Sequence, residues 1–583
     1  MVESADTIET ALDIRCSASE DLILDDSRRL TGPGLLWSHV GANLDVLCPS
    51  EHLDQVIPVW RQQARRVLDA IGWKQEKIID RRFETGANLA VSSPMDQLYT
   101  AMFACQTAWH FTAAQLLHAV PNNFDIMIDD LIKVSQREAN PALMALISAA
   151  NSHGIDVLCD DDELSLGHGI GSQTWSVFDL PQPEDVNWTN LHDVPVALIT
   201  GTNGKTTSTR LCSAIGTAAD LTAGITSTEF VRVGDDILDY GDYSGPGGAR
   251  MLLRDKRLEV AFLEVARGGI LRRGLPLRQA RAALVTNVAA DHLGQYGVNT
   301  VEELAVAKFA VHRTLASGGI LVLNADDDYV VDEARRTQAN LCWFSLDPAH
   351  GLITDAKNKG LTCAWLEEDH LVYFDGNRAC SIVKVQDIPI TMGGAADYNI
   401  RNALGALCLA KAMGIDDDAI ATGLCGFNND AKDNPGRCNE FSVNGARVFV
   451  DFAHNPHSIS AVTNAMASIP AKRRFVMISH AGDRSNRNIL DATQSALTLK
   501  PDVLMAAELP QYLRGRELGD TTQLTHQQDK QQGMLAHQLM LADGPAAGAQ
   551  KILDQLQPGD LALLLVLSER EQVFDLITTA KND

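Results

Sequence analysis

The chain has 583 residues, a formal net charge of −26 at pH 7 and a pI near 5.0. This length predicts about three or four domains, and the negative charge excludes a broad nucleic-acid surface, because phosphates need basic side chains. The cysteines include no CxxC pair, so neither a disulfide framework nor a zinc knuckle is indicated. Residues 1–12 lack the features of a secretory signal, and no apolar run has transmembrane length. We therefore expect a cytoplasmic protein without nucleic-acid or membrane partners.

Residues 1–190 are expected to form an N-terminal α+β domain that binds a substrate or acceptor. A glycine- and proline-rich turn at 31–34 precedes two long amphipathic runs, at 55–71 and 94–119, which predict helices. The polar stretch 181–193 is typical of an exposed connector, so the domain boundary is placed there.

Residues 191–432 alternate short apolar runs with helical patterns. This alternation predicts a central, doubly wound and mainly parallel sheet that carries a P-loop. A turn-rich segment at 341–391 predicts a small antiparallel addition, and a helix is expected at 398–413. The expected strands are 194–200, 258–263, 282–286 and 320–323.

After a Pro-Gly-Arg sequence at 435–437 the alternation starts again. Residues 433–583 therefore predict a smaller, Rossmann-like α/β domain, so that the whole chain is of the α/β class with three domains. Its expected strands are 447–451, 474–479, 502–506 and 560–567.

The sequence TGTNGKTT at 200–207 lies between an apolar strand and a helix. Glycine-rich backbone amides and a helix N-terminus can surround phosphate oxygens there; Lys205 would reach the terminal phosphates of ATP and the Thr206 hydroxyl would coordinate Mg²⁺. Ile199 stands where a strict P-loop has its first glycine. A glycine-rich turn with an exposed lysine is the alternative, and the loop alone would suit any kinase or ATPase. The candidate nucleotide-binding residues are Gly201, Thr202, Asn203, Gly204, Lys205, Thr206 and Thr207.

Several motifs in order resemble those of the Mur ligase superfamily. Besides the loop they are LEVARGG, TNVAADHL, ELAVAKFAV, ADYNIRNALGA, NPGRCNEF, DFAHNP and HAGDRSNRN. Within the superfamily, GDYSGPG at 241–247, ARGGILRRGL at 266–275 and YLRGRELG at 512–519 are similar to the cyanophycin synthetase branch, and RRLTGPGLLWS at 28–38 is a shorter match. The ATP-grasp module of that branch has no counterpart in this sequence.

The resemblance implies roles for further residues. Glu264 and His292 would bind metal, and Lys308 would do so as a carbamate. Asn399 and Asn402 would lie beside the nucleotide base. Arg437 and the 451–456 turn would belong to the entry of the C-terminal domain, with Asp451 at the ribose and His454 and Asn455 at the phosphates and acyl group. The phosphate loop and the 451–456 turn should therefore face each other across one cleft.

The implied reaction is an ATP-dependent amide ligation. The enzyme would phosphorylate a substrate carboxylate to an acyl phosphate, which the amine of an amino acid or peptide-like substrate would attack. Lys205, His292, Lys308, Arg437 and His454 are the expected catalytic residues, with Arg484 as a further stabiliser of charge. The alternatives are a catalytically silent paralogue that binds nucleotide or polymer, and a folylpolyglutamate-synthetase-like ligase for another substrate. A homo-oligomer is a possible assembly.

Most of these residues also have a structural interpretation. Lys308 would then be a surface lysine, His292 a core histidine and Glu264 a cap of the following turn, while Asn399 and Asn402 would be helix N-caps. The arginines Arg267, Arg272 and Arg273 fit either an acidic substrate, through bidentate contacts to carboxylates, or a solvated charged face.

Overall fold

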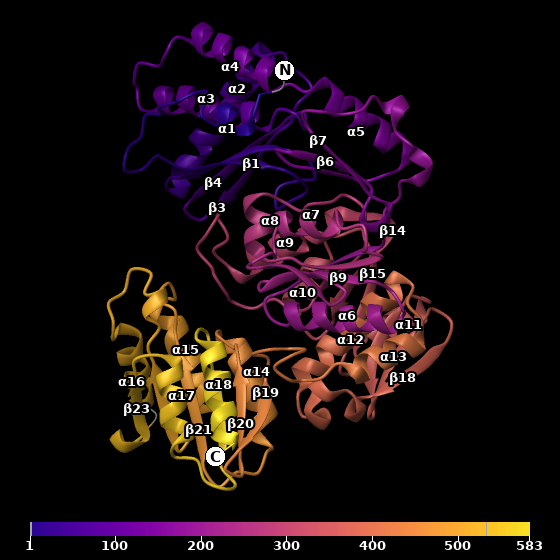
Figure 1. Cartoon of the computed structure of the whole chain (residues 1–583). Coiled ribbons are helices and arrows are strands. Elements are labelled where there is room, and N and C mark those ends of the chain that lie inside the picture. The colour runs from indigo at the N-terminus through magenta and orange to yellow at the C-terminus, as the bar shows by residue number, and fades with distance from the viewer. Residues whose placement is uncertain (1–2, 532, 583) are drawn as a thin grey trace.

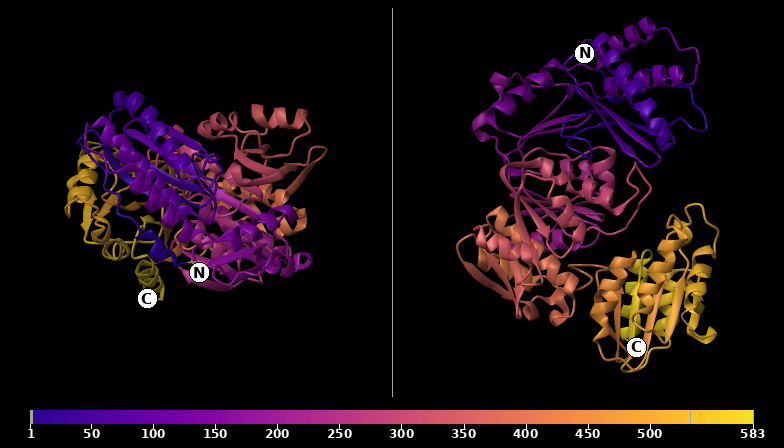
Figure 2. Two further views of the ribbon diagram at one scale, coloured as in Figure 1. Left: turned by 90° about the horizontal axis from the view of Figure 1, so that it is seen from above. Right: turned by 180° about the vertical axis from the view of Figure 1, so that it is seen from behind.

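The computed structural model describes residues 3–531 and 533–582, which form three bodies (Figure 1). The N-terminal and C-terminal parts lie on different sides of the central part, and the views in Figure 2 show the same arrangement. None of the helices in the described part of the chain combines the length and the apolarity needed to cross a lipid bilayer.

The N-terminal part contains a four-stranded antiparallel sheet covered by helices, as the α+β prediction required. The predicted helices correspond to α2 (Leu53–Ala70) and α3 (Leu98–Leu116), which pack together and against the sheet through the fully buried Trp60 and Trp109. A small second sheet follows. The strands are β1 (Ile23–Leu30), β2 (Gly41–Leu47), β3 (Ile78–Phe83), β4 (Gly86–Ser92), β5 (Val157–Cys159), β6 (Glu163–Leu166) and β7 (Gln173–Ser176); further helices are α4 (Phe124–Glu138) and α5 (Pro141–His153).

The central part contains an eleven-stranded mixed sheet. Its strands are β8 (Val196–Thr200), β9 (Ala223–Thr226), β10 (Phe230–Val233), β11 (Asp236–Tyr240), β12 (Val260–Glu264), β13 (Ala280–Val285), β14 (Leu315–Asn324), β15 (Asn340–Ser345), β16 (Cys363–Glu367), β17 (His370–Phe374) and β18 (Ala379–Lys384). The run β9-β12-β8-β13-β14-β15-β16 is parallel, and the strands at both edges are antiparallel. The segment 341–391 extends the main sheet, first with the parallel strands β15 and β16 and then with the antiparallel strands β17 and β18, so the predicted antiparallel addition is confirmed only for its last part.

Helices cover both faces of this sheet, which explains why β8 is apolar throughout. Val196 and Leu198 of β8 point into one hydrophobic core, and Ala197 and Ile199 into the other, because side chains alternate along a strand. The helices are α6 (Lys205–Ala218), α12 (Asp397–Met413) and α13 (Asp417–Gly426) on one face, and α7 (Pro246–Leu253), α8 (Arg267–Arg272), α9 (Val301–Phe309), α10 (Asp328–Ala334) and α11 (Gly351–Asn358) on the other (Figure 1).

The C-terminal part is a smaller, Rossmann-like α/β unit. Its six strands run in the order β19-β20-β24-β21-β22-β23, and only β19 is antiparallel to its neighbour. They are β19 (Asn439–Val443), β20 (Ala446–Asp451), β21 (Arg474–Ser479), β22 (Val503–Ala507), β23 (Leu539–Ala542) and β24 (Leu561–Leu565). Helices α14 (Pro456–Ala467) and α15 (Asn486–Leu497) pack on one face, and α17 (Pro545–Leu553) and α18 (Arg570–Asn582) on the other; α16 (Asp520–Gln531) lies next to α15.

Candidate active site

Three neighbouring strands of the central sheet deliver the predicted residues to one edge. β8 lies between β12 and β13, and all three strands are parallel, so their carboxyl ends meet. The phosphate loop follows β8, Glu264 ends β12, and Asp291 and His292 lie in the loop after β13.

The phosphate loop is a tight cradle that admits only glycine at two positions. A Cβ atom at Gly201 would lie 1.8 Å from Thr286 Oγ1, and one at Gly204, whose φ is +83°, would lie 2.3 Å from Asn402 Oδ1. Gly204 is also the N-cap of α6, whose first amides have no partner inside the helix. Lys205 Nζ donates to Thr202 O at 3.0 Å, which turns the ammonium back over the loop. This combination of free amides and a cation fits the phosphates of a nucleotide.

Glu264 is 2% exposed, and neither of its carboxylate oxygens has a hydrogen-bond partner among the described residues. Burial raises its pKa, although the charge of Lys205, the nearby Thr206 hydroxyl and the charge of Arg437 oppose this effect. A buried and unpaired carboxylate is costly, and a divalent cation would satisfy it with the hard oxygen ligand that Mg²⁺ prefers. The alternative role, a cap of the following turn, is wrong because no backbone amide reaches this side chain.

Lys308 lies near the end of α9 and is 4% exposed. Its Nζ donates to Gly201 O at 2.7 Å, so the side chain lies under the phosphate loop. Burial, and then the charge of Lys205, lower its pKa well below the usual lysine value. The alternative of a surface lysine is therefore wrong, and the lowered pKa favours the neutral amine more than at an exposed lysine.

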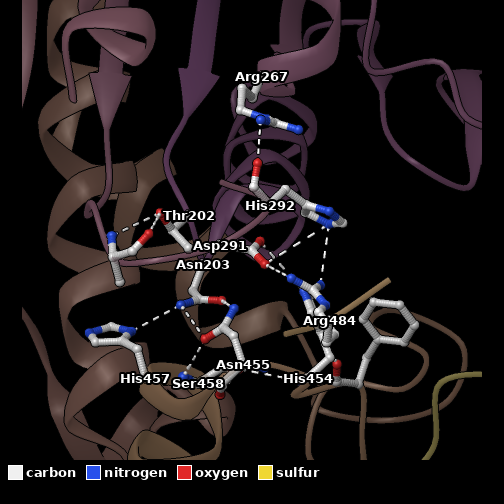
Figure 3. A network of polar contacts seen from close by, with 12 residues as sticks. Thr202, Asn203, Arg267, Asp291, His292, His454, Asn455, His457, Ser458 and Arg484 are labelled. Atoms are coloured by element: carbon white, nitrogen blue, oxygen red, sulfur yellow. Dashed lines mark hydrogen bonds and ion pairs between the residues drawn. The ribbon is translucent and has the colours of Figure 1, made fainter. Parts of the chain in front are cut away.

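The loop after β13 that carries Asp291 and His292 is called the metal loop here. Through Asp291 it contacts the C-terminal part of the molecule (Figure 3). Arg484 Nη1 donates to Asp291 Oδ1 at 2.5 Å, and Arg484 Nη2 lies 3.3 Å from His292 Nε2. His454 Nε2 is 3.7 Å from Asp291 Oδ2 and His292 Nε2 is 3.9 Å from Asp291 Oδ1. Asp291, His292 and His454 are close enough to share one metal ion. Asp291 directly precedes His292 in the TNVAADHL motif and was not among the predicted site residues.

Charges and burial set the protonation of this cluster. Burial would raise the pKa of Asp291, but the His454 imidazole and the Arg484 guanidinium outweigh it and hold the pKa far below the usual range. Burial, together with the positive charges of Arg484 and Arg267, lowers the pKa of His292 to about 4. His292 is therefore neutral near pH 7, as a metal ligand must be. Its side chain is 40% exposed, so it is not a core histidine.

The phosphate loop and the 451–456 turn contact each other directly (Figure 3). Asn455 Nδ2 donates to Asn203 Oδ1 at 3.0 Å, and Asn203 Nδ2 lies 2.9 Å from His457 Nδ1. Arg437 lies at the junction between the two parts, and its Nη2 donates to Thr206 Oγ1 at a distance of 3.4 Å. The expectation that the two turns face one cleft is confirmed.

Asn399 and Asn402 lie inside α12 and are buried, so the N-cap interpretation is wrong. Asn399 Nδ2 donates to Ile390 O at 2.7 Å, and Asn402 Nδ2 donates to Asn399 Oδ1 at 3.1 Å, which leaves Asn402 Oδ1 against Gly204. Asp451, at the end of β20, lines the same cleft; burial raises its pKa to about 6, against the opposing charge of Arg437.

One cleft of about 1430 Å³ is lined by the phosphate loop, Glu264, Lys308, the Asp291 cluster and, from the 451–456 turn, residues 451–454, and it extends toward α7 and α8. Arg267, Arg272 and Arg273 line that extension. Arg267 donates to His292 O, so it belongs to the metal loop, whereas Arg272 is exposed and Arg273 is half-buried. The three arginines thus do not form one uniform solvated face.

Two further cross-domain contacts were missed in the sequence. His457, which directly follows the 451–456 turn, reaches the phosphate loop. Glu229 accepts from Arg210 Nη2 at 3.0 Å and from Arg570 Nη1 at 3.1 Å, and so links the central part to α18. No local pattern identifies the partners of Glu229, because they are far apart in the sequence.

Comparison with known proteins agrees with this architecture. Residues 199–410 match the Mur ligase middle domain, and residues 436–566 match the Mur ligase glutamate ligase domain. From 199 to 566 the chain therefore belongs to the Mur ligase superfamily.

Among its relatives are two cyanophycin synthetases. The enzyme of Trichormus variabilis is 36% identical over 328 residues, which are 56% of this chain and 35% of the relative. The enzyme of Synechocystis sp. is 33% identical over 389 residues, which are 67% of this chain and 44% of the relative. The alignments thus span less than half of these relatives. The solved structure of E. coli FolC in complex with ADP, without folate substrate, has 20% identity and a TM-score of 0.50, and covers 67% of this chain and 90% of FolC. It shows the same fold.

Proposed function

We propose that the protein is an ATP-dependent amide ligase, which couples a carboxylate substrate to the amine of an amino acid or peptide-like substrate. The observation that carries this proposal is the single cleft in which the phosphate loop meets the Asn455 turn around the buried, unpaired Glu264. A kinase or simple ATPase does not need a second domain whose His-Asn turn reaches the phosphate loop. The similarity to cyanophycin synthetases supports the same reaction class.

ATP would be held across both parts of the molecule. The backbone amides of 201–207 and Lys205 would bind the phosphates, Asn399 and Asn402 would lie at the base, and Asp451 would face the ribose. Asn455 and Arg437 already contact the phosphate loop, so they are placed to complete the nucleotide site when the domains close.

Mg²⁺, when bound, would neutralise the phosphate oxygens and so reduce their repulsion of an attacking carboxylate. Thr206, Glu264, His292 and a carbamylated Lys308 are the proposed ligands. The lowered pKa of Lys308 favours the uncharged amine, which is the form that reacts with CO₂, and the new carboxylate would supply a second hard oxygen ligand beside His292.

The reaction has two steps. A carboxylate oxygen of the first substrate attacks the γ-phosphorus of ATP, and ADP leaves with the electrons of the broken P–O bond. The amine then attacks the acyl carbon, loses a proton, and expels inorganic phosphate. Lys205, Arg437, Arg484 and His454 would stabilise the negative charge that develops in both steps, because they surround the cleft with fixed donors.

The substrates are small molecules or peptides. Arg272 and Arg273 would bind carboxylates of an acidic acceptor in the arm of the cleft toward α8. We further propose domain bounds of 1–190, 191–432 and 433–583, a cytoplasmic location and a homo-oligomeric assembly. A catalytically silent paralogue is disfavoured, because one cleft retains all five of the residues that the reaction would need: Lys205, Glu264, His292, Lys308 and Asp451.

The test is incubation of the full chain with ATP, Mg²⁺ and a pool of amino acids and short peptides. ADP release should depend on both a carboxylate and an amine substrate, and mass spectrometry should detect a product equal to their sum less one water. Lys205→Ala should abolish both signals, whereas Lys256→Ala, at an exposed site of the same domain, should retain them. ADP release that no acid and amine pair stimulates would refute the ligase assignment.

A further inference from the structure

The loop that carries Asp291 and His292 has an unusual backbone. His292 and Tyr296 have φ of +49° and +56°, and Gly294 and Gly297 have φ of +90° and +69°. Left-handed conformations are unfavourable for residues with a side chain, and they persist only where the surroundings impose them. The loop therefore needs contacts from outside to hold its shape.

Strand β3 of the N-terminal part supplies such contacts. Arg81 Nη1 donates to Gly297 O at 2.8 Å, and the ring of Phe83 lies so close that a Cβ atom at Gly297 would come within 2.4 Å of it. Residues two apart share a face of a strand, so Arg81 and Phe83 both point to the loop. Arg82 points the other way and pairs with Asp54 at 2.7 Å on the surface.

Arg81 also reaches the helix that carries Lys308. Its Nη2 donates to Glu303 Oε1 at 3.0 Å, and both side chains of this pair are largely buried, with 18% and 25% exposure. Glu303 forms a capping box with Thr300 at the start of α9, and its other carboxylate oxygen accepts from Asn299 N at 2.7 Å. The helix start and the loop before it are thus tied to one guanidinium.

A second N-terminal arginine, Arg28, contacts the same loop and its neighbour α8. Arg28 is 8% exposed, donates through Nε to Leu271 O of α8 at 3.1 Å, and lies over the Tyr296 ring at 5.1 Å. Asp45 orients it through two hydrogen bonds, at 2.5 and 3.0 Å. The N-terminal part therefore contacts the loop through two arginines, while none of its described residues lines the cleft.

We propose that the N-terminal domain positions the metal loop of the neighbouring domain, with Arg81 as the positioning residue for both His292 and Lys308. Arg81 contacts neither proposed ligand. It acts by fixing the Gly297 carbonyl behind His292 and the first turn of the helix that ends near Lys308. This inference rests on the proposed function for its metal, but the mechanical part stands on the contacts alone.

The experiment compares Arg81→Ala, Arg81→Lys and the matched control Arg82→Ala in the full chain. Hydrogen exchange of the 292–303 amides, measured without nucleotide, should be about tenfold faster in Arg81→Ala than in the wild type and unchanged in Arg82→Ala. The Mg²⁺ concentration for half-maximal ADP release should rise about tenfold in Arg81→Ala, since groups that orient metal ligands typically contribute 10–100-fold to affinity. Arg81→Lys keeps the charge but not the fork, so it should fall between the two.

The two readouts separate two kinds of failure. If the wild type releases no ADP but the exchange of 292–303 responds only to the Arg81 variants, the proposed function fails and the positioning role stands. If Arg81→Ala matches Arg82→Ala in both hydrogen exchange and Mg²⁺ dependence, the positioning role is overturned. Should Arg81→Ala not fold, the same comparison between Arg81→Lys and Arg82→Ala decides it.

Discussion

Replacing Glu264 by glutamine should make the free protein more stable while it weakens the binding of magnesium nucleotide. The wild-type carboxylate is buried and has no hydrogen-bond partner among the described residues. Glutamine has nearly the same shape but no charge, so it removes most of the cost of burying an ion. It also removes the anionic oxygen that we propose for Mg²⁺.

The magnitude follows from that unpaired group. A buried unsatisfied polar group costs about 1–3 kcal/mol, and a charged one more, and Lys205 and Arg437 offset part of the cost here. We expect Glu264→Gln to stabilise the free protein by about 1–3 kcal/mol, or about 2–4 °C in Tm per kcal/mol for a domain of this size. Magnesium nucleotide at about 100 times its Kd would raise the free energy of unfolding of the wild type by about 2.7 kcal/mol. It would raise that of the variant much less.

The gain should also depend on pH. Burial raises the pKa of Glu264 in the folded state above the unfolded value. Below the unfolded pKa, Glu264 is protonated in both the folded and the unfolded state, so its burial costs the wild type no stability. Between the two pKa values only the folded state keeps the proton, so the free energy of unfolding falls as pH rises through the folded pKa. The difference in Tm between the variant and the wild type should therefore widen as pH rises above the ordinary glutamate pKa and become constant above the folded pKa.

Thermal melts in EDTA and in Mg²⁺ with a non-hydrolysable ATP analogue measure both effects. Glu84→Gln, which removes the same charge from an exposed turn between β3 and β4, is the control and should change neither. A variant that is less stable than the wild type in EDTA, or that gains as much from magnesium nucleotide, would refute the reasoning.

Three further substitutions test other parts of the site. Gly204→Ala should weaken nucleotide binding by at least about tenfold, because the new Cβ would strike Asn402 of α12 and the backbone φ is left-handed. The control Gly72→Ala, with φ of +88° and open space around it, should lose stability but not nucleotide affinity. Equal nucleotide affinities of the two variants by calorimetry would contradict this. Protein depleted of CO₂ should regain activity with bicarbonate, and Lys308→Met should not respond; because the Lys308 pKa is lowered, reactivation should persist to a lower pH than an ordinary lysine allows. Asn455→Asp keeps the cap of α14 and the oxygen that accepts from Asn203 Nδ2, but it loses the donation from Nδ2 to Asn203 Oδ1. We expect kcat to fall about 2–10-fold with little change in Tm, and an unchanged kcat would count against this interdomain donation as part of catalysis.

Much of the fold could be predicted because its signals are local. The all-apolar 194–200 run indicated a strand covered on both faces, and β8 packs into two cores. The glycine turn and the lysine after it indicated the phosphate loop for the same reason. By contrast, the parallel pairing of β15 within the 341–391 segment depends on a partner strand, β14, that no short window reveals.

The site was predictable residue by residue, but its cross-domain geometry was not. The DHL sequence after β13 pointed to His292, yet the importance of Asp291 appears only when Arg484 and His454 arrive from the C-terminal part. Asn399 and Asn402 had two alternative roles in the sequence, and the structure places Asn402 against Gly204 and Asn399 next to Asn402 inside α12. Arg81 carries no motif, because its function depends on contacts with a loop more than two hundred residues away.

The central claim is that a carboxylate becomes an acyl phosphate before the amine attacks. It is tested most directly by supplying the carboxylate substrate, once the product screen has identified it, with oxygen-18 in its carboxyl group. Inorganic phosphate released with the amide should carry one labelled oxygen, because the bridging oxygen leaves with the phosphoryl group. Amide formation with unlabelled phosphate, or with the label in AMP, would contradict the account.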